Sequence, residues 1–221
     1  MAEVFHRSFF LEGPVGRLEA LLWTVPPAVS PGDPSFVALV CHPHPLFGGT
    51  MHNKVVYQAA KALHQSGAPV LRFNFRGAGL SEGKHDKGNG EQGDVRAALD
   101  YLAREFPGRA IVLAGFSFGA FAGLRVGCGD ARVTQVIGLG LPANNKSMDL
   151  NFLPACAKPK LVLQGGNDQF GSQANVEALF ATLTEPKRLV IVEGADHFFT
   201  GHLDQVGAAM RDWLVDMPPG R

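Results

Sequence analysis

The stretch Ala110-Ile111-Val112-Leu113-Ala114-Gly115-Phe116-Ser117-Phe118-Gly119 decides the fold of this chain. Its first five residues are apolar and predict a buried strand, and the small residues at 120–126 that follow predict a helix. Between the two lies the pattern G-x-S-x-G, whose glycines permit a sharp turn because they carry no side chain to collide with the strand or the helix. Such a turn presents the serine hydroxyl at its tip. Ser117 is therefore the candidate nucleophile.

The same pattern occurs a second time, at Gly79-Leu80-Ser81-Glu82-Gly83. The residues that follow it, 84–90, are polar and rich in glycine, and they cannot open a helix. Because the motif requires a strand before it and a helix after it, Ser81 is interpreted as a loop residue.

Composition bounds the size and the partners of the protein. The chain has 221 residues, of which 46% are hydrophobic, and this suits one domain spanning residues 1–221. Its 20 basic and 20 acidic residues cancel, so we expect a small-molecule partner, with no nucleic acid and no membrane surface. Residues 1–10 do not resemble a signal peptide, and no apolar run approaches the length of a membrane span. We therefore expect a cytoplasmic protein.

The cysteines are few and widely spaced. Cys41, Cys128 and Cys156 are odd in number, which favours reduced, inert thiols over a disulfide framework or a zinc site. Cys41 ends an apolar run beside the proposed site, so a modulating role for it is left open against simple burial.

Alternating strands and helices predict the architecture. Residues 4–11 and 17–24 read as an antiparallel hairpin. Six short apolar strands follow, typical of a parallel sheet with helices on both faces; they are 36–41, 69–75, 110–114, 133–139, 160–163 and 188–192. Helices are predicted at 53–65, 90–105, 118–126, 172–183 and 200–215. The fold class is thus a doubly wound α/β sheet of about eight strands, with a loop at 26–34 and a frayed tail at 217–221.

A serine nucleophile needs a base to remove its proton and an acid to orient that base. Asp168 and His197 each lie just beyond the carboxyl end of a predicted strand, where open α/β sheets gather their functional groups. The main rival for the acid is Asp149, and Asp196 and His202 are neighbours that could be mistaken for partners. The favoured catalytic residues are Ser117, Asp168 and His197, in that chain order.

That order, together with the turn at Ser117, resembles the α/β-hydrolase superfamily over nearly the whole chain. The stretches His42-Pro43-His44-Pro45-Leu46-Phe47-Gly48-Gly49 and Phe75-Arg76-Gly77-Ala78-Gly79-Leu80-Ser81-Glu82-Gly83 look like those of small bacterial hydrolases related to dienelactone hydrolase. Dienelactone hydrolase itself has a cysteine as nucleophile where this chain has Ser117, which puts dienelactone chemistry in doubt. Members of the superfamily often insert a lid after the sixth strand, but residues 142–159 are too few for one.

The resemblance also implies an oxyanion hole made of two backbone N–H groups. The first is that of Phe118, directly after the nucleophile. The second comes from the loop after the third strand, where Pro43 and Pro45 have no N–H to give. Setting this loop against the family's pattern points to Leu46, with Phe47 close behind.

Histidines and glycines nearby invite other interpretations. His42, His44 and His52 suggest a metal, but no carboxylate or cysteine pattern supports them, so we expect no metal and no cofactor, and the first two order the loop. The sequence Gly77-Ala78-Gly79 begins like a dinucleotide-binding fingerprint but lacks its third glycine. We interpret it as a tight loop that Arg76 anchors.

The motif loops are rich in phenylalanine, so we expect an open, apolar site. The residues predicted to bind substrate are Phe47, Phe116, Phe170 and Phe198. The favoured function is hydrolysis of esters or thioesters of small acyl or aryl groups through an acyl-enzyme. The alternatives are acyl transfer by the same triad and a binding module without catalysis.

Overall fold

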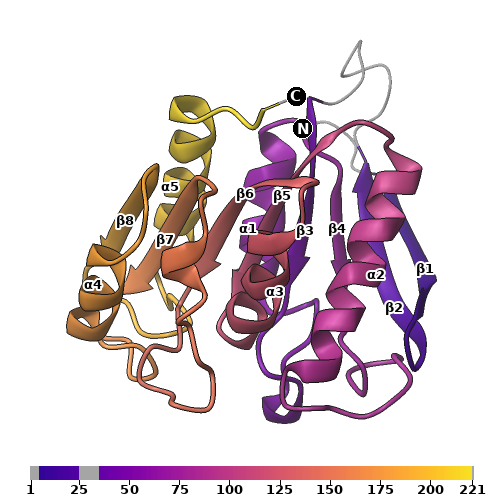
Figure 1. Ribbon diagram of the computed structural model, residues 1–221, viewed down its shortest axis with the longest axis horizontal. Coiled ribbons are helices and arrows are strands. Elements are labelled where there is room, and N and C mark those ends of the chain that lie inside the picture. The colour runs from indigo at the N-terminus through magenta and orange to yellow at the C-terminus, as the bar shows by residue number, and fades with distance from the viewer. Residues whose placement is uncertain (1–4, 25–34, 221) are drawn as a thin grey trace.

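A computed structural model describes residues 5–24 and 35–220, and its centre is one eight-stranded sheet (Figure 1). The strands are ordered β1-β2-β4-β3-β5-β6-β7-β8 across the sheet. Their bounds are β1 Phe5–Gly13, β2 Gly16–Thr24, β3 Phe36–Cys41, β4 Val70–Phe73, β5 Ala110–Phe116, β6 Val133–Leu139, β7 Lys160–Gly165 and β8 Lys187–Val192. The predicted loop at 26–34 falls outside the described residues. The predicted doubly wound α/β class is confirmed.

Strand direction reverses twice at one end of the sheet, because β2 runs against both of its neighbours. β1 and β2 form the predicted antiparallel hairpin, and β2 also runs antiparallel to β4. The remaining neighbours, from β4 to β8, are all parallel. Parallel pairing places their carboxyl ends along one edge, with Cys41 beside Gly115 and Phe116 beside Leu139. This edge is where the functional side chains gather.

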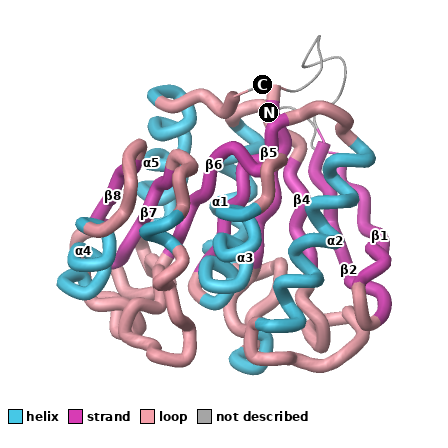
Figure 2. Tube along the Cα trace, in the orientation of Figure 1, coloured by secondary structure: helices cyan, strands magenta, loops and turns pink. Residues whose placement is uncertain are grey.

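Helices cover both faces of the sheet, which explains why strands such as β3, β5 and β7 are buried throughout (Figure 2). α1 and α5 pack on one face, and α2, α3 and α4 on the other. Their bounds are α1 Lys54–Gln65, α2 Asn89–Glu105, α3 Phe118–Gly129, α4 Gln173–Ala181 and α5 Leu203–Asp216, with short 3-10 turns η1 Pro45–Phe47 and η2 Leu153–Ala155. Within residues 5–24 and 35–220, no helix has the length and apolar character needed to cross a membrane.

The cysteines correct a prediction. Cys128 in α3 and Cys156 just after η2 form a disulfide, with their Cα atoms 5.2 Å apart, so these two are not the reduced thiols that the sequence favoured. Spacing could not reveal the pair, because residues 28 apart meet only when the 142–159 segment folds back onto α3. Cys41 is free and buried, and burial raises the pKa of its thiol.

Side-chain hydrogen bonds hold the start of the C-terminal tail and the 75–83 loop in place. The carbonyl of Met217 accepts a hydrogen bond from the Gln135 side chain, so the first residue of the tail that was predicted to be frayed is anchored. Arg76 anchors the 75–83 loop, as predicted, through a buried, two-pronged ion pair with Asp94.

Candidate active site

The turn between β5 and α3 holds Ser117 in a conformation that few residues adopt. Its φ is +55° and its ψ is −116°, and its amide donates to the carbonyl of Leu139 on β6 at 2.9 Å. A Cβ at Gly115 would overlap the backbone of Gly119, and one at Gly119 would overlap the carbonyl of Cys41. The glycines are therefore needed for the close approach of strand, turn and helix, as the sequence predicted.

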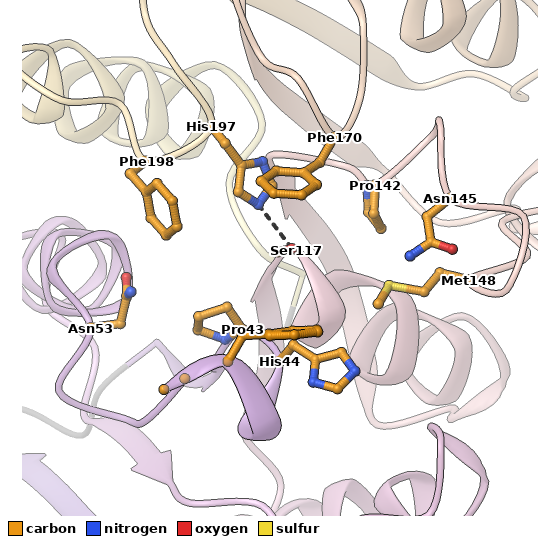
Figure 3. Close-up of a pocket in the computed structure, with 13 residues that line it drawn as sticks. Pro43, His44, Asn53, Ser117, Pro142, Asn145, Met148, Phe170, His197 and Phe198 are labelled. Atoms are coloured by element: carbon orange, nitrogen blue, oxygen red, sulfur yellow. Dashed lines mark hydrogen bonds between the residues drawn. The ribbon is translucent and has the colours of Figure 1, made fainter.

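Ser117, His197 and Asp168 form a chain of two hydrogen bonds, and Figure 3 shows the one between Ser117 and His197. His197 Nε2 lies 2.9 Å from Ser117 Oγ, and His197 Nδ1 lies 2.7 Å from Asp168 Oδ2. All three residues are nearly buried, with 9%, 3% and 4% of the residue surface exposed for Ser117, His197 and Asp168 respectively. This is the geometry in which an imidazole removes a hydroxyl proton while a carboxylate fixes its tautomer.

Asp168 is oriented by more than the histidine. Its Oδ1 accepts from the amides of Phe170 and Gly171 at 2.8 and 3.0 Å, and its Oδ2 accepts from Gln164 Nε2 at 2.7 Å. Gln164 is a residue that the sequence reasoning missed. The available signal was an uncharged polar side chain near the end of the buried strand β7, where such a group needs a partner.

A pocket of about 310 Å³ opens in front of Ser117 and His197. Of the predicted substrate-binding residues, Phe47, Phe170 and Phe198 line it and are 85%, 48% and 38% exposed. Phe116 does not line it, which corrects that prediction. Phe116 ends the buried strand β5, so its ring is fully buried and packs against the His197 ring, with centroids 4.9 Å apart.

A family model described as an alpha/beta hydrolase domain matches residues 39–213. The chain belongs to the α/β hydrolase family. The match covers the loop after β3, the turn at Ser117 and both of the other predicted catalytic residues. The superfamily resemblance is confirmed, and the relation to dienelactone hydrolase stays a prediction.

Relatives extend this result over nearly the whole chain. An uncharacterized protein of Rickettsia prowazekii is 38% identical over 215 residues, which cover 94% of this chain and 88% of its own. A serine hydrolase from Xanthomonas campestris described as lacking a lid is 35% identical, with a TM-score of 0.88 over 98% of this chain and 96% of that one. A serine hydrolase homologue from Coxiella burnetii is 36% identical, with a TM-score of 0.85 over 94% and 97%. The hydrolase thus has the lidless architecture that the short 142–159 segment predicted.

The rival residues of this hydrolase lie elsewhere. Ser81 donates to the carbonyl of Asn74 and accepts from the amide of Glu19, so its hydroxyl is part of a loop. Asp149 caps the amide of Asn151 on the 142–159 segment, away from the histidine. The structure brings neither of them to His197.

The loop after β3 is ordered by its histidines, as predicted. His42 is fully buried, and its Nδ1 donates to the carbonyl of Pro43 at 2.6 Å while its Nε2 accepts from the amide of Phe75 at 2.9 Å. Burial lowers the pKa of His42 to about 3, so the ring is neutral. His44 Nδ1 accepts from the amide of Leu46 at 3.2 Å, and burial, with the nearby His85, lowers its pKa as well.

The backbone amides of this loop differ in whether they already donate a hydrogen bond. Leu46 donates to His44 Nδ1, and Leu46 does not line the pocket, so the amide that the sequence favoured is already engaged. The Phe47 amide donates to the carbonyl of His44 at 3.1 Å. Within residues 5–24 and 35–220, the amides of His44 and of Phe118, the first residue of α3, have no acceptor.

The pocket also contains residues that the sequence gave no reason to choose. Asn53, the N-cap of α1, lies on the same side of Ser117 as Phe198 (Figure 3). Pro142, Asn145 and Met148 lie on the opposite side and come from the segment between β6 and β7. The segment that is too short for a lid therefore forms a wall of the pocket instead.

Proposed function

We propose that this α/β hydrolase cleaves carboxylic esters or thioesters of small acyl or aryl groups, with Ser117 as nucleophile, His197 as base and Asp168 as the acid that orients it. The observation that carries the proposal is the hydrogen-bonded chain Oγ to Nε2 and Nδ1 to Oδ2, at 2.9 and 2.7 Å. A hydroxyl at an ordinary turn has no need of a buried imidazole backed by a carboxylate that accepts four hydrogen bonds.

The reaction would proceed in two halves. Ser117 Oγ attacks the carbonyl carbon as its proton passes to His197 Nε2, and the tetrahedral intermediate collapses when His197 returns that proton to the departing alcohol or thiol. Water then loses a proton to Nε2 as it attacks the acyl-enzyme carbonyl carbon. The second tetrahedral intermediate breaks its bond to Ser117 Oγ, which takes the proton back from Nε2, and the carboxylic acid is released. Asp168 stays ionised throughout and keeps the ring proton on Nδ1.

The oxyanion would be held by two amides at the base of the pocket. We assign the first to Phe118, whose N–H belongs to the unsatisfied first turn of α3. For the second we replace Leu46 by His44. Of residues 43–47, two are prolines without an N–H and the other two amides are engaged, which leaves His44.

The pocket supports small, apolar substrates. Its volume of about 310 Å³ and its exposed rim of Phe47, Phe170 and Phe198 suit a short acyl chain or an aromatic ring. We accordingly expect activity on short-chain rather than long-chain esters, with water as the acceptor.

Two measurements test the proposal. Purified protein is incubated with p-nitrophenyl acetate, with and without a competing alcohol, and the products are separated into acid and new ester. Labelling of Ser117 by a fluorophosphonate, located by peptide mass spectrometry, is the second measurement. Mostly free acid and a label on Ser117 would support hydrolysis. A dominant new ester would indicate acyl transfer, and absence of both label and turnover would favour a binding module.

A further inference from the structure

A second set of hydrogen bonds reaches the turn that bears His197. Lys54 Nζ donates to Thr200 Oγ1 at 2.9 Å, and Thr200 Oγ1 donates to Asp196 Oδ2 at 2.9 Å. Lys54 is the first residue of α1, whereas Asp196 and Thr200 bracket His197 in the turn after β8. We propose that Lys54, Thr200 and Asp196 are positioning residues that hold the His197 imidazole against Ser117. This inference rests on the proposed function, because it assigns His197 the role of base.

Asp196 is the residue through which the turn is tied together. Its Oδ1 accepts from the amides of Phe198 and Thr200 at 3.0 and 2.9 Å, so the residue before His197 is tied to the backbone of two residues after it. The hydrogen bonds from Thr200 and Phe198, together with the Lys54 charge, hold the pKa of the Asp196 carboxyl below its usual range. The carboxylate is therefore ionised at neutral pH and attracts the Lys54 ammonium.

The turn needs this support because its backbone is strained. Phe199 has a φ of +50°, in the left-handed region that non-glycine residues rarely adopt, and its side chain is fully buried. Such a conformation persists only where its surroundings hold it in place. If the bonds of Asp196 were lost, the turn would be free to relax around the buried Phe199 ring. His197, two residues away, would move with it.

Lys54 links this turn to the wall of the pocket. Asn53, its neighbour, lines the pocket, and Lys54 Nζ lies 5.9 Å from the centre of the Phe198 ring, which lines it as well. Figure 3 shows Asn53 and Phe198 on the same side of Ser117. The ammonium thus fastens the start of α1 to the turn that bears His197.

The position of these bonds favours an effect on catalysis over one on stability. Lys54 and Thr200 are exposed, and exposed polar pairs contribute little to the free energy of unfolding. Catalysis is more sensitive, because a displacement of about 1 Å can lower a rate by about 100-fold. For a partial loosening of the turn we expect about a tenfold fall in kcat, with KM changed by less than about twofold.

The test compares variants that differ by one hydroxyl or one charge. Thr200→Val removes the hydroxyl and keeps the branched shape, Thr200→Ser restores the hydroxyl, and Lys54→Met removes the donor. Thr182→Val removes a hydroxyl that donates to the Leu179 carbonyl at the end of α4, and it is the matched control for a lost threonine hydrogen bond. Lys61→Met, at an exposed lysine of the same helix α1, is the control for a lost charge.

Steady-state kinetics on p-nitrophenyl acetate should show the tenfold fall in kcat for Thr200→Val and a smaller fall for Lys54→Met. Thr200→Ser and both controls should keep the wild-type kcat. A kcat for Thr200→Val equal to that of wild type would overturn the inference, as would an equal loss in Thr182→Val. Wild-type protein that neither turns over nor labels at Ser117 would instead contradict the proposed function.

A spectroscopic readout keeps the two failures apart without needing turnover. The proton between His197 Nδ1 and Asp168 gives a far-downfield proton resonance when the imidazole is held in place. We expect this resonance in wild type, Thr200→Ser and Thr182→Val, and its broadening or loss in Thr200→Val. An unchanged resonance in Thr200→Val would show that the Lys54–Thr200–Asp196 bonds do not position the ring.

Discussion

Replacing Asp168 by asparagine is the sharpest perturbation of the proposed triad, because it changes one atom of a group with four hydrogen bonds. The amides of Phe170 and Gly171 both donate to Oδ1, so the oxygen of the new amide must occupy that place. The NH₂ group then takes the place of Oδ2, facing His197 Nδ1 at about the present 2.7 Å. Two donors cannot share that contact, so Nδ1 must become the acceptor.

The side-chain amide of Gln164 cannot relieve this arrangement by rotating so that its oxygen and nitrogen exchange places. Its Oε1 accepts from the amide of Leu141 at 2.8 Å, and its Nε2 donates to the carbonyl of Gly171 at 2.8 Å as well as to Asp168. The ring proton of the histidine therefore moves to Nε2, where the hydroxyl of Ser117 needs an acceptor. A tautomer error of this kind lowers kcat about 10⁴-fold, which equals about 5 kcal/mol of transition-state stabilisation.

The assay is the initial rate of p-nitrophenyl acetate hydrolysis for Asp168→Asn, with circular dichroism to establish that the variant is folded. Asp149→Asn and Asp196→Asn are measured beside it and should lose far less, because neither carboxylate contacts the His197 ring. If folded Asp168→Asn kept more than about a tenth of the wild-type kcat, the tautomer argument would fail. If Asp149→Asn lost more than Asp168→Asn, the role of acid would pass to Asp149.

Four further outcomes are expected. Ser117→Ala should lower turnover on the order of 10⁶-fold while Ser81→Ala changes little, and the reverse ranking in the same ester assay would show that the wrong motif was chosen. Rates on p-nitrophenyl esters from acetate to palmitate should peak at short chains, because an open pocket buries few of the methylenes that would each contribute about 0.8 kcal/mol. The rate should not jump when an ester passes its solubility limit, and a maximum at palmitate would contradict the open pocket. The pKa of His42 falls from 6.5 to about 3 on folding, so between these pH values the unfolded chain binds a proton that the folded chain does not bind. Urea titrations should therefore show about 2 kcal/mol less stability at pH 5 than at pH 8. A flat pH profile would exclude a buried neutral ring. Denatured, unreduced protein should titrate as one thiol rather than three, and reducing Cys128–Cys156 should cost about 3–4 kcal/mol of stability.

The sequence predicted the sheet well because each strand carried its own local signal. Buried parallel strands are short apolar runs bounded by glycine, proline or polar residues, and those runs appear in the sequence whatever surrounds them. Ser117, Asp168 and His197 could be placed for a related reason. Each lies within five residues of the end of such a run, and the carboxyl ends of parallel strands meet at one edge of the sheet.

What the sequence could not predict depends on contacts between distant segments. The disulfide requires that 142–159 fold back onto α3, and no local pattern encodes that path. The prediction of Phe116 failed because a phenylalanine near the nucleophile has the same local signal whether its ring points into the pocket or into the core. Leu46 was favoured by the loop pattern of the family that the chain resembles, and that pattern does not show that the side chain of His44 accepts the Leu46 amide.

Backbone contact at the turn of Ser117 also bears on how freely this hydrolase can change. β3, the turn and α3 meet at Gly115 and Gly119 without side chains between them. The distance from the nucleophile to its neighbours is therefore set by main-chain thickness alone and is independent of which residues line the pocket. A library randomised at Phe47, Asn145 and Met148 should yield many folded proteins with altered selectivity, whereas one randomised at the two glycines should return glycine. The same scaffold can in this way acquire new substrates without rebuilding its reacting atoms.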